Sequence, residues 1–195
     1  TTPPPPPRNL QSVDGEGEVF LNWTAPVLAN TSSVPDLSGY WVYRAENQTN
    51  FSTAASAGSA TINVVSAAGF SVGNTIILGP NGSSEVEIAT INSIVGNSFT
   101  LSSNLKYDYS LGNPIYGPAT AITESVPAGT EFYKDKTVVN GTTYYYAVVA
   151  EDTSVNKNKS DPSNVIVSNP DIDNVAPAAP ESLEARPVDN GILLN

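Results

Sequence analysis

The sequence predicts an all-β protein in which two antiparallel sheets pack face to face. Short runs rich in β-branched and aromatic residues recur along its 195 residues, and clusters of Gly, Pro, Asn and Ser separate them. This pattern is typical of strands joined by tight turns. Residues 144–152 carry apolar side chains on both faces of the expected strand, which predicts a central strand with something packed on each side.

The composition excludes several classes of function. The chain contains no Cys, His or Met, so it lacks thiol nucleophiles, imidazole bases and the usual ligands of zinc, copper and haem. We therefore expect a protein that is not an enzyme and that needs no cofactor, with calcium the one candidate considered below. The formal net charge of −11 predicts no nucleic-acid partner. No apolar run reaches the roughly 20 residues of a membrane span, and the abundance of Ser, Thr, Asn, Pro and Gly is typical of extracellular and cell-surface β-proteins.

Six strands are expected to form the sandwich, at residues 9–13, 18–23, 39–44, 131–135, 144–152 and 163–168. Tyr40 and Val42 should face the core, and Tyr144 follows Val138 by six positions across an Asn-Gly turn. With Trp23, these features resemble a fibronectin type III domain, which is an immunoglobulin-like sandwich. The resemblance implies that Trp23 fills the core and that Tyr144 is a tyrosine corner, with its hydroxyl bonded to nearby backbone.

The family pattern is interrupted after residue 50, and its next recognisable piece begins at residue 131. A structureless loop of that length inside a compact domain is improbable, and residues 54–117 have their own alternation of short apolar runs and turns. We therefore predict a small inserted β-barrel or roll at 54–117, within a discontinuous sandwich formed by residues 8–53 and 118–169. The arrangement resembles repeat units of microbial extracellular surface or filament proteins.

The beginning of the chain recurs near its end. Residues 1–7 are predicted to be a Pro-rich linker, and Pro4, Leu10 and Leu21 align with Pro177, Leu183 and Leu194, a shift of 173 positions. This internal repeat predicts a linker at 170–177 and, at 178–195, the first two strands of a second sandwich. Such a ribbon is marginal alone, so either a tandem domain or another subunit, through strand addition, should complete it. The apolar side chains that need this cover are Leu183, Ile192, Leu193 and Leu194.

An outward aromatic group is a candidate interaction surface. Trp41, Tyr43 and Tyr145 should project from the outer face of the sheet that contains residues 39–44 and 144–152. Three occupants remain open for this surface, namely the inserted module, a neighbouring subunit and carbohydrate.

Two further sets of residues are candidates for a metal site and for modification. Asp and Asn oxygens are the ligands that calcium prefers, although turns use the same residues. The candidate calcium ligands are Asp152, Asn156, Asn158, Asp161, Asp171 and Asp173. The pattern Asn-x-Ser/Thr predicts N-glycosylation in an extracellular protein. The expected acceptors are Asn30, Asn47, Asn50, Asn81, Asn140 and Asn158.

These observations predict a non-enzymatic structural subunit of an extracellular filament, surface layer or stalk. It would self-associate into a polymer or be joined to tandem neighbouring domains, through sandwich contacts and strand addition by residues 178–195. The alternative is a carbohydrate-binding or adhesin module, or a spacer domain of a secreted polysaccharide-degrading enzyme, with glycans as partners.

Overall fold

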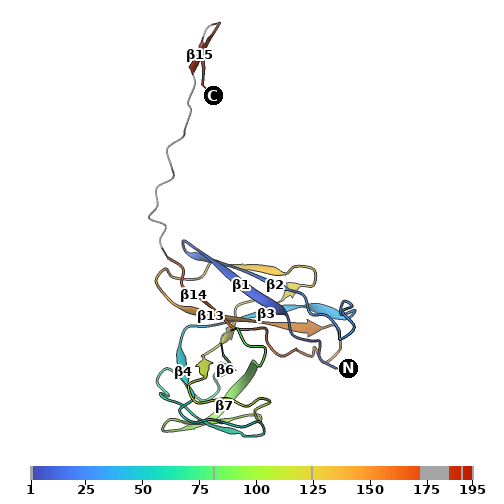
Figure 1. Cartoon of the computed structure of the whole chain (residues 1–195), viewed down its shortest axis with the longest axis vertical. Coiled ribbons are helices and arrows are strands. Elements are labelled where there is room, and N and C mark those ends of the chain that lie inside the picture. Colours follow the sequence, from blue (N-terminus) through green and yellow to red (C-terminus); the bar gives the residue numbers. More distant parts are fainter. Residues whose placement is uncertain (1, 81, 124, 172–184, 190, 195) are drawn as a thin grey trace.

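The computed structural model describes residues 2–80, 82–123, 125–171, 185–189 and 191–194 (Figure 1). Its regular secondary structure over these residues is sixteen β-strands with no helix, which confirms the predicted all-β class. Accordingly, no described helix is long and apolar enough to cross a membrane.

Two antiparallel sheets form a fibronectin type III-like sandwich. The first has the order β1 (Arg8–Gly15), β2 (Glu18–Thr24) and β12 (Phe132–Asp135). The second has the order β10 (Thr120–Ala121), β3 (Leu37–Ala45), β13 (Tyr144–Asp152) and β14 (Ile166–Ser168), and β11 (Val126–Pro127) also pairs with β3. The central strand predicted at 144–152 is therefore β13, which has a neighbour on each side.

The core of the sandwich contains the side chains that alternation assigns to the inner faces. Tyr40, Val42 and Tyr146 are fully buried, and Trp23 is 6% exposed. The rings of Trp23 and Tyr40 meet edge to face with their centroids 5.2 Å apart, a favoured geometry for an aromatic pair. Trp23 therefore fills the space between the two sheets, as the family resemblance implies.

A second sheet system lies beside the sandwich, with six strands in the order β4 (Gln48–Asn50), β9 (Pro114–Tyr116), β6 (Thr75–Leu78), β7 (Glu87–Val95), β8 (Ser98–Leu101) and β5 (Thr61–Asn63). Its two edge strands meet, because Ser52 N donates to Asn63 O at 2.9 Å and Val65 N donates to Asn50 O at 2.9 Å. These bonds close the sheet into a barrel-like arrangement around its own apolar core, which includes Phe51, Ile91 and Phe99.

The boundary of this six-stranded sheet differs from the expected one. The sequence predicts that the sandwich continues to residue 53, whereas Gln48–Asn50 pair with β9. Thr49 is buried opposite Ile115, but its neighbours are polar, so the segment lacks the apolar alternation that marks a strand. That the six-stranded sheet is an independently folding inserted domain stays a prediction.

The N-terminal segment also differs from the expected linker. Pro4 and Pro7 are buried and Pro5 and Pro6 are partly buried, so residues 4–7 pack on the molecule instead of forming a solvated spacer. Residues 6–11 line a cavity of about 580 Å³ together with residues 82–84 and 162–164. This segment therefore lies at the junction between the sandwich and the six-stranded sheet.

Near the C-terminus, β15 (Ala185–Val188) and β16 (Gly191–Leu194) form an antiparallel hairpin. This hairpin lies where the internal repeat predicts the first two strands of a second sandwich. Ile192 is 70% exposed. Leu183 and the linker residues from 172 onward lie outside the described residues, as do the side chains of Leu193 and Leu194.

Candidate functional site

The outer face of β3 and β13 is covered by the six-stranded sheet. Tyr43 and Tyr145 from this face are partly buried against an apolar cluster that both parts of the protein build. The buried members of this shared cluster are Ala45, Ala147, Ala119 and Val165 together with Ile77, Val86 and Tyr116. The rings of Tyr145 and Tyr116 lie 4.5 Å apart, and burial, with a smaller contribution from Tyr145, raises the pKa of Tyr116 to about 12.

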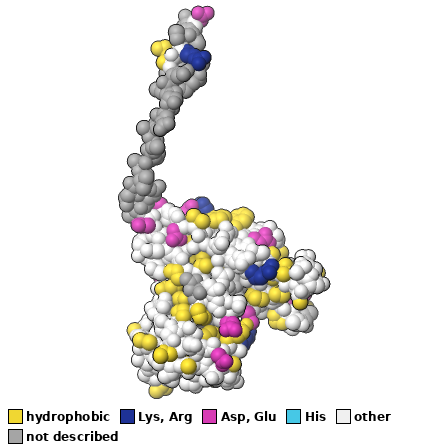
Figure 2. Space-filling model, in the orientation of Figure 1, with side chains coloured by type: hydrophobic (Ala, Val, Ile, Leu, Met, Phe, Trp, Pro, Cys, Tyr) yellow, Lys and Arg dark blue, Asp and Glu magenta, His cyan; other side chains and the backbone are white. Residues whose placement is uncertain are grey.

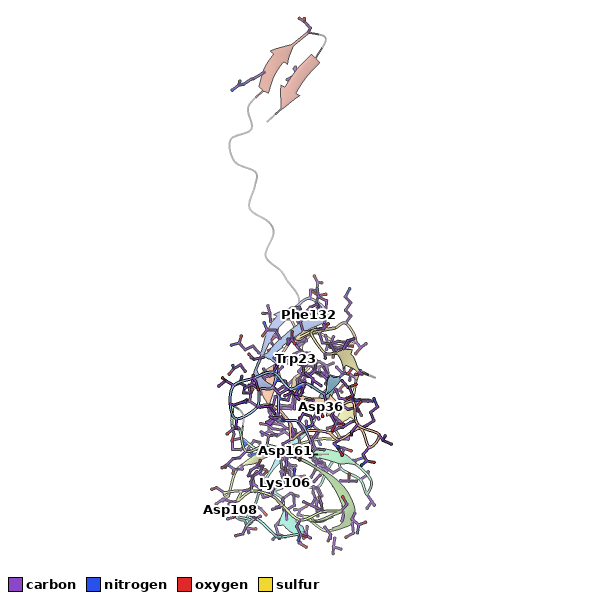
Figure 3. The ribbon with its side chains drawn as sticks, turned by 90° about the vertical axis from the view of Figure 1, so that its right-hand side faces the viewer. Trp23, Asp36, Lys106, Asp108, Phe132 and Asp161 are labelled. Atoms are coloured by element: carbon purple, nitrogen blue, oxygen red, sulfur yellow. The ribbon has the colours of Figure 1, made fainter. Side chains whose placement is uncertain are left out.

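Polar contacts surround the shared cluster. Gly82 N donates to Val165 O at 3.3 Å, which connects the loop between β6 and β7 to the segment before β14. Lys106 forms an ion pair with Asp161, and the hydroxyl of Tyr107 donates to the same carboxylate at 3.4 Å. Figure 3 shows Lys106 and Asp161 next to each other where the two parts meet. These contacts and the apolar cluster fix the six-stranded sheet against the sandwich.

Trp41 has a different environment from the two tyrosines. Its indole Nε1 donates to Glu151 Oε2 at 2.8 Å, and Lys159 Nζ lies 3.7 Å from the ring centroid. The same ammonium group lies 3.4 Å from the hydroxyl of Tyr43. The described residues of the shared cluster include Tyr43 and Tyr145 but not Trp41. The three rings therefore do not form one open platform, and a cation–π contact covers one face of Trp41.

Asp152 and Asn158, two of the candidate calcium ligands, come together in the loop after β13. Asp152 Oδ1 accepts hydrogen bonds from the backbone N–H and hydroxyl of Ser154 at 3.1 and 2.5 Å and from Asn158 N at 3.0 Å, while Oδ2 accepts from Asn158 Nδ2 at 2.8 Å. Hydrogen bonds from Ser154 and Asn158 outweigh burial and lower the pKa of Asp152. Asn158 directs its amide N–H toward Asp152 and not its oxygen. The two side chains therefore stabilise the loop through a hydrogen bond in which Asn158 is the donor and Asp152 the acceptor.

Of the other candidate calcium ligands, the structure describes Asn156, Asp161 and Asp171. Asp161 is in the ion pair with Lys106, Asn156 and Asp171 are exposed, and Asp173 lies outside the described residues. Across the described chain, no group of three or more His, Cys, Asp and Glu side chains could hold a metal ion. Calcium binding stays a prediction that these contacts do not support.

Three of the six predicted glycosylation acceptors donate a hydrogen bond from the side-chain nitrogen to which a glycan would be attached. Nδ2 of Asn47 donates to Ala68 O at 3.1 Å, and Nδ2 of Asn50 donates to Gly112 O at 2.8 Å. With Asn158, whose Nδ2 donates to Asp152 Oδ2, three acceptor nitrogens are therefore hydrogen-bonded to the protein, and attaching a glycan would break these hydrogen bonds.

Asn30 and Asn140 are placed differently. Asn30 is exposed, and only its oxygen is in a described hydrogen bond, from the backbone N–H and hydroxyl of Ser32 at 3.1 and 2.6 Å. Asn140 is half-buried, and its oxygen accepts from Gly17 N at 2.7 Å. Asn81 lies outside the described residues. Of the six acceptors, Asn30 is the most accessible one that the structure describes.

A buried ionic network was not expected from the sequence. Asp135 is fully buried, accepts hydrogen bonds from Arg44 at 2.8 Å and from the hydroxyl of Tyr146 at 2.9 Å, and is also bonded by the backbone and hydroxyl of Thr137. Burial alone would raise the pKa of Asp135, but the hydrogen bonds from Thr137, Arg44 and Tyr146 together lower it. Arg44 and Asp135 are 91 positions apart, so no local pattern could reveal the pair.

The outer face of the sheet β1-β2-β12 carries an exposed aromatic pair that the sequence reading also missed. The rings of Phe20 and Phe132 are stacked with centroids 6.0 Å apart, Phe132 is 54% exposed and Val13 is 64% exposed. Lys134 and Glu18 form an ion pair beside them at 2.7 Å. Phe132 lies on the side of the sandwich remote from the six-stranded sheet (Figure 3), and hydrophobic side chains are visible along this edge (Figure 2). The sequence does contain a signal for this apolar outer face, because Val13 and Phe20 alternate along their strands with residues of the core.

Comparisons with known proteins show a structural likeness. No model of a protein family matches the chain, and no curated protein matches it. A solved structure described as a Fn3-like protein from Clostridium thermocellum is 15% identical, with a TM-score of 0.35, and the match covers 88% of this chain and 99% of that one. The assignment of this chain to a fibronectin type III-like β-sandwich rests on its own strand order and packing.

Proposed function

We propose that the chain is a non-enzymatic structural module of an extracellular assembly, such as a filament, a surface layer or a stalk. The observation that supports this proposal most directly is the apolar cluster shared by the sandwich and the six-stranded sheet. A sheet face that is used for internal packing is not open to a ligand. The cluster instead holds two β-structures in one fixed orientation, as a module with a mechanical role requires.

The face of the sheet β1-β2-β12 is the surface that we propose for contacts between modules. It combines Phe20 and Phe132 with the exposed Val13, and the ion pair of Glu18 and Lys134 is at its side. Exposed apolar side chains flanked by polar ones are typical of protein interaction sites. The interface would be a sandwich-to-sandwich contact.

The proposal is tested by the assembly state of the protein. We expect electron microscopy of the native material to reveal filaments or ordered sheets, and sedimentation of the purified chain to depend on concentration. Phe132→Asp should weaken this association at least tenfold, because it places a charge at the centre of the apolar face. Val72→Asp is the matched control, since Val72 is also exposed, at 61%, but lies in the turn before β6 of the six-stranded sheet.

Two outcomes would contradict the proposal. One is dispersed particles in the native material together with a monomer at all concentrations. The other is equal association of Phe132→Asp and Val72→Asp. Removing residues 174–195 separates two modes of assembly, because association through strand addition would be lost and association through the β1-β2-β12 face would remain.

A further inference from the structure

The hairpin β15-β16 has the same strand register as β1-β2. In the first hairpin the paired positions are Val13↔Phe20, Asp14↔Val19 and Gly15↔Glu18. In the second they are Arg186↔Leu193, Pro187↔Ile192 and Val188↔Gly191. Each residue of the second set lies 173 positions after its counterpart in the first, which is the shift of the sequence repeat.

The shared register adds to the sequence repeat, because two similar sequences could still pair their strands in different registers. A slip of one residue would turn every side chain of a strand to the opposite face of the hairpin. With the register shared, the role of each residue in β2 transfers to its counterpart in β16. Ile192 corresponds to Val19 and Leu194 to Leu21, and both of these β2 side chains are fully buried. Leu193 corresponds to Phe20, on the outer face.

We infer that β15-β16 is the first hairpin of a second sandwich of the same type. In the first sandwich, β2 pairs with β12 so that Val19 lies opposite Asp135 and Leu21 lies opposite Tyr133. The partner of β16 is therefore a strand equivalent to β12, which pairs opposite Ile192 and Leu194. A sheet equivalent to β3-β13 covers the apolar face of the hairpin.

The partner strands are not those of the first sandwich in another copy of this chain. In another copy, β2 already occupies the edge of β12 that β16 would need for this register. Its core positions are also filled by Val19, Leu21 and Trp23. Insertion from another copy would have to displace a complete hairpin. The inference concerns folding alone and does not depend on the proposed assembly.

A fusion protein tests the inference. Asn195 corresponds to Asn22, so residues 1–195 followed directly by residues 23–169 restore a whole second sandwich if the register is right. We expect a second protease-resistant unit, identified by mass spectrometry, that begins near residue 178. We also expect a calorimetric unfolding enthalpy well above that of residues 1–195. A matched fusion in which residues 5–22 replace 178–195 provides the reference for a correct second sandwich.

Two substitutions in the fusion make the test specific. Ile192→Asp should abolish protection of the second unit, because Ile192 takes the buried place of Val19. Leu193→Asp should leave it protected, because Leu193 takes the outer place of Phe20. In residues 1–195 alone, neither substitution should change Tm. A second unit that is degraded while the reference fusion is protected would overturn the inference, and so would equal effects of the two substitutions.

Discussion

At the residue scale, the sandwich depends on Asp135, a buried carboxylate whose partners come from distant parts of the chain. Arg44 from β3 and Tyr146 from β13 both bond to it across the core. A charge removed from water needs such partners, because its desolvation costs several kcal/mol. The network thus connects β12 of one sheet to the two central strands of the other.

Replacing this carboxylate should be costly. Asp135→Asn leaves the Arg44 guanidinium, whose side chain is only 15% exposed, without its counter-charge, and we expect a loss of about 3 kcal/mol in the free energy of unfolding, measured by urea titration near neutral pH. Glu18→Gln is the control, since its ion pair with Lys134 is exposed, and it should change little. Equal effects of the two variants would contradict this role for Asp135.

The same network predicts a pH dependence. The pKa of Asp135 is lower in the folded protein than its ordinary value, so the folded state binds this proton more weakly than the unfolded chain. The stabilisation is then complete above the pKa of an unfolded Asp, about 3.9, and is lost as the pH falls through the folded value. Urea unfolding between about pH 6 and pH 3 should therefore show a steeper loss of stability for the natural chain than for Asp135→Asn.

Tyr144 gives a smaller and more local prediction. Its hydroxyl accepts a hydrogen bond from Val139 N at 2.8 Å, as expected of a tyrosine corner. Val139 is exposed, so water can replace the lost acceptor, and Tyr144→Phe should cost about 1 kcal/mol of unfolding free energy. Tyr133→Phe is a suitable comparison, because the hydroxyl of Tyr133 has no described hydrogen bond. An unchanged Tm for Tyr144→Phe would argue against the corner.

At the scale of the elements, the sequence predicts strands best where apolar residues alternate. The strand expected at 18–23, where apolar residues alternate, is β2 (Glu18–Thr24), and the strand expected at 144–152 is β13 with the same bounds. The segment of β4 was missed because only Thr49 is buried in it and its pairing with β9 supplies the strand conformation. The interactions of Asp135 could not be predicted, because its partners are set by the fold and not by neighbours in sequence. The cover over Tyr145 was one of three alternatives that the sequence left open.

The contact between β13 and β9 can be measured with a double-mutant cycle. Tyr145 and Tyr116 are both partly or fully buried and their rings are 4.5 Å apart, so Tyr145→Ala and Tyr116→Ala should be coupled by about 0.5 to 1.5 kcal/mol. A coupling near zero would mean that the two parts do not hold each other through this pair. Pairing Tyr145→Ala with Phe132→Ala provides an uncoupled reference, because Phe132 lies on the other sheet.

At the scale of the whole molecule, both connections to the six-stranded sheet leave the sandwich at the same place. Arg44 in β3 pairs with Thr120 in β10, and Gly117 N donates to Asn47 O at 2.9 Å. A two-residue turn can therefore join Glu46 to Ala119 in place of residues 47–118. This geometry makes the prediction of an inserted domain testable by deletion.

The deletion variant should still unfold cooperatively, because the sandwich core on the other side of β13 is retained. It should be less stable and less soluble than the natural chain, since the face that carries Tyr43 and Tyr145 becomes exposed. Calorimetry and light scattering measure both effects, and adding Tyr43→Ser and Tyr145→Ser should restore solubility. A variant that has no cooperative transition even with these serines would contradict an autonomous sandwich.

The closeness of the two connections to the six-stranded sheet also determines how the molecule would respond to a stretching force. A pulling force applied to the chain on either side of the sandwich acts on β1 and on the segment between Pro162 and β14. Asn164 in that segment holds the two together through two hydrogen bonds with the backbone of Leu10, at 2.9 and 3.0 Å. The pulling force bypasses the six-stranded sheet, because the strands through which the chain enters and leaves this sheet, β4 and β9, are paired with each other. Stretching forces would therefore rupture the clamp at Asn164 before they deformed the six-stranded sheet.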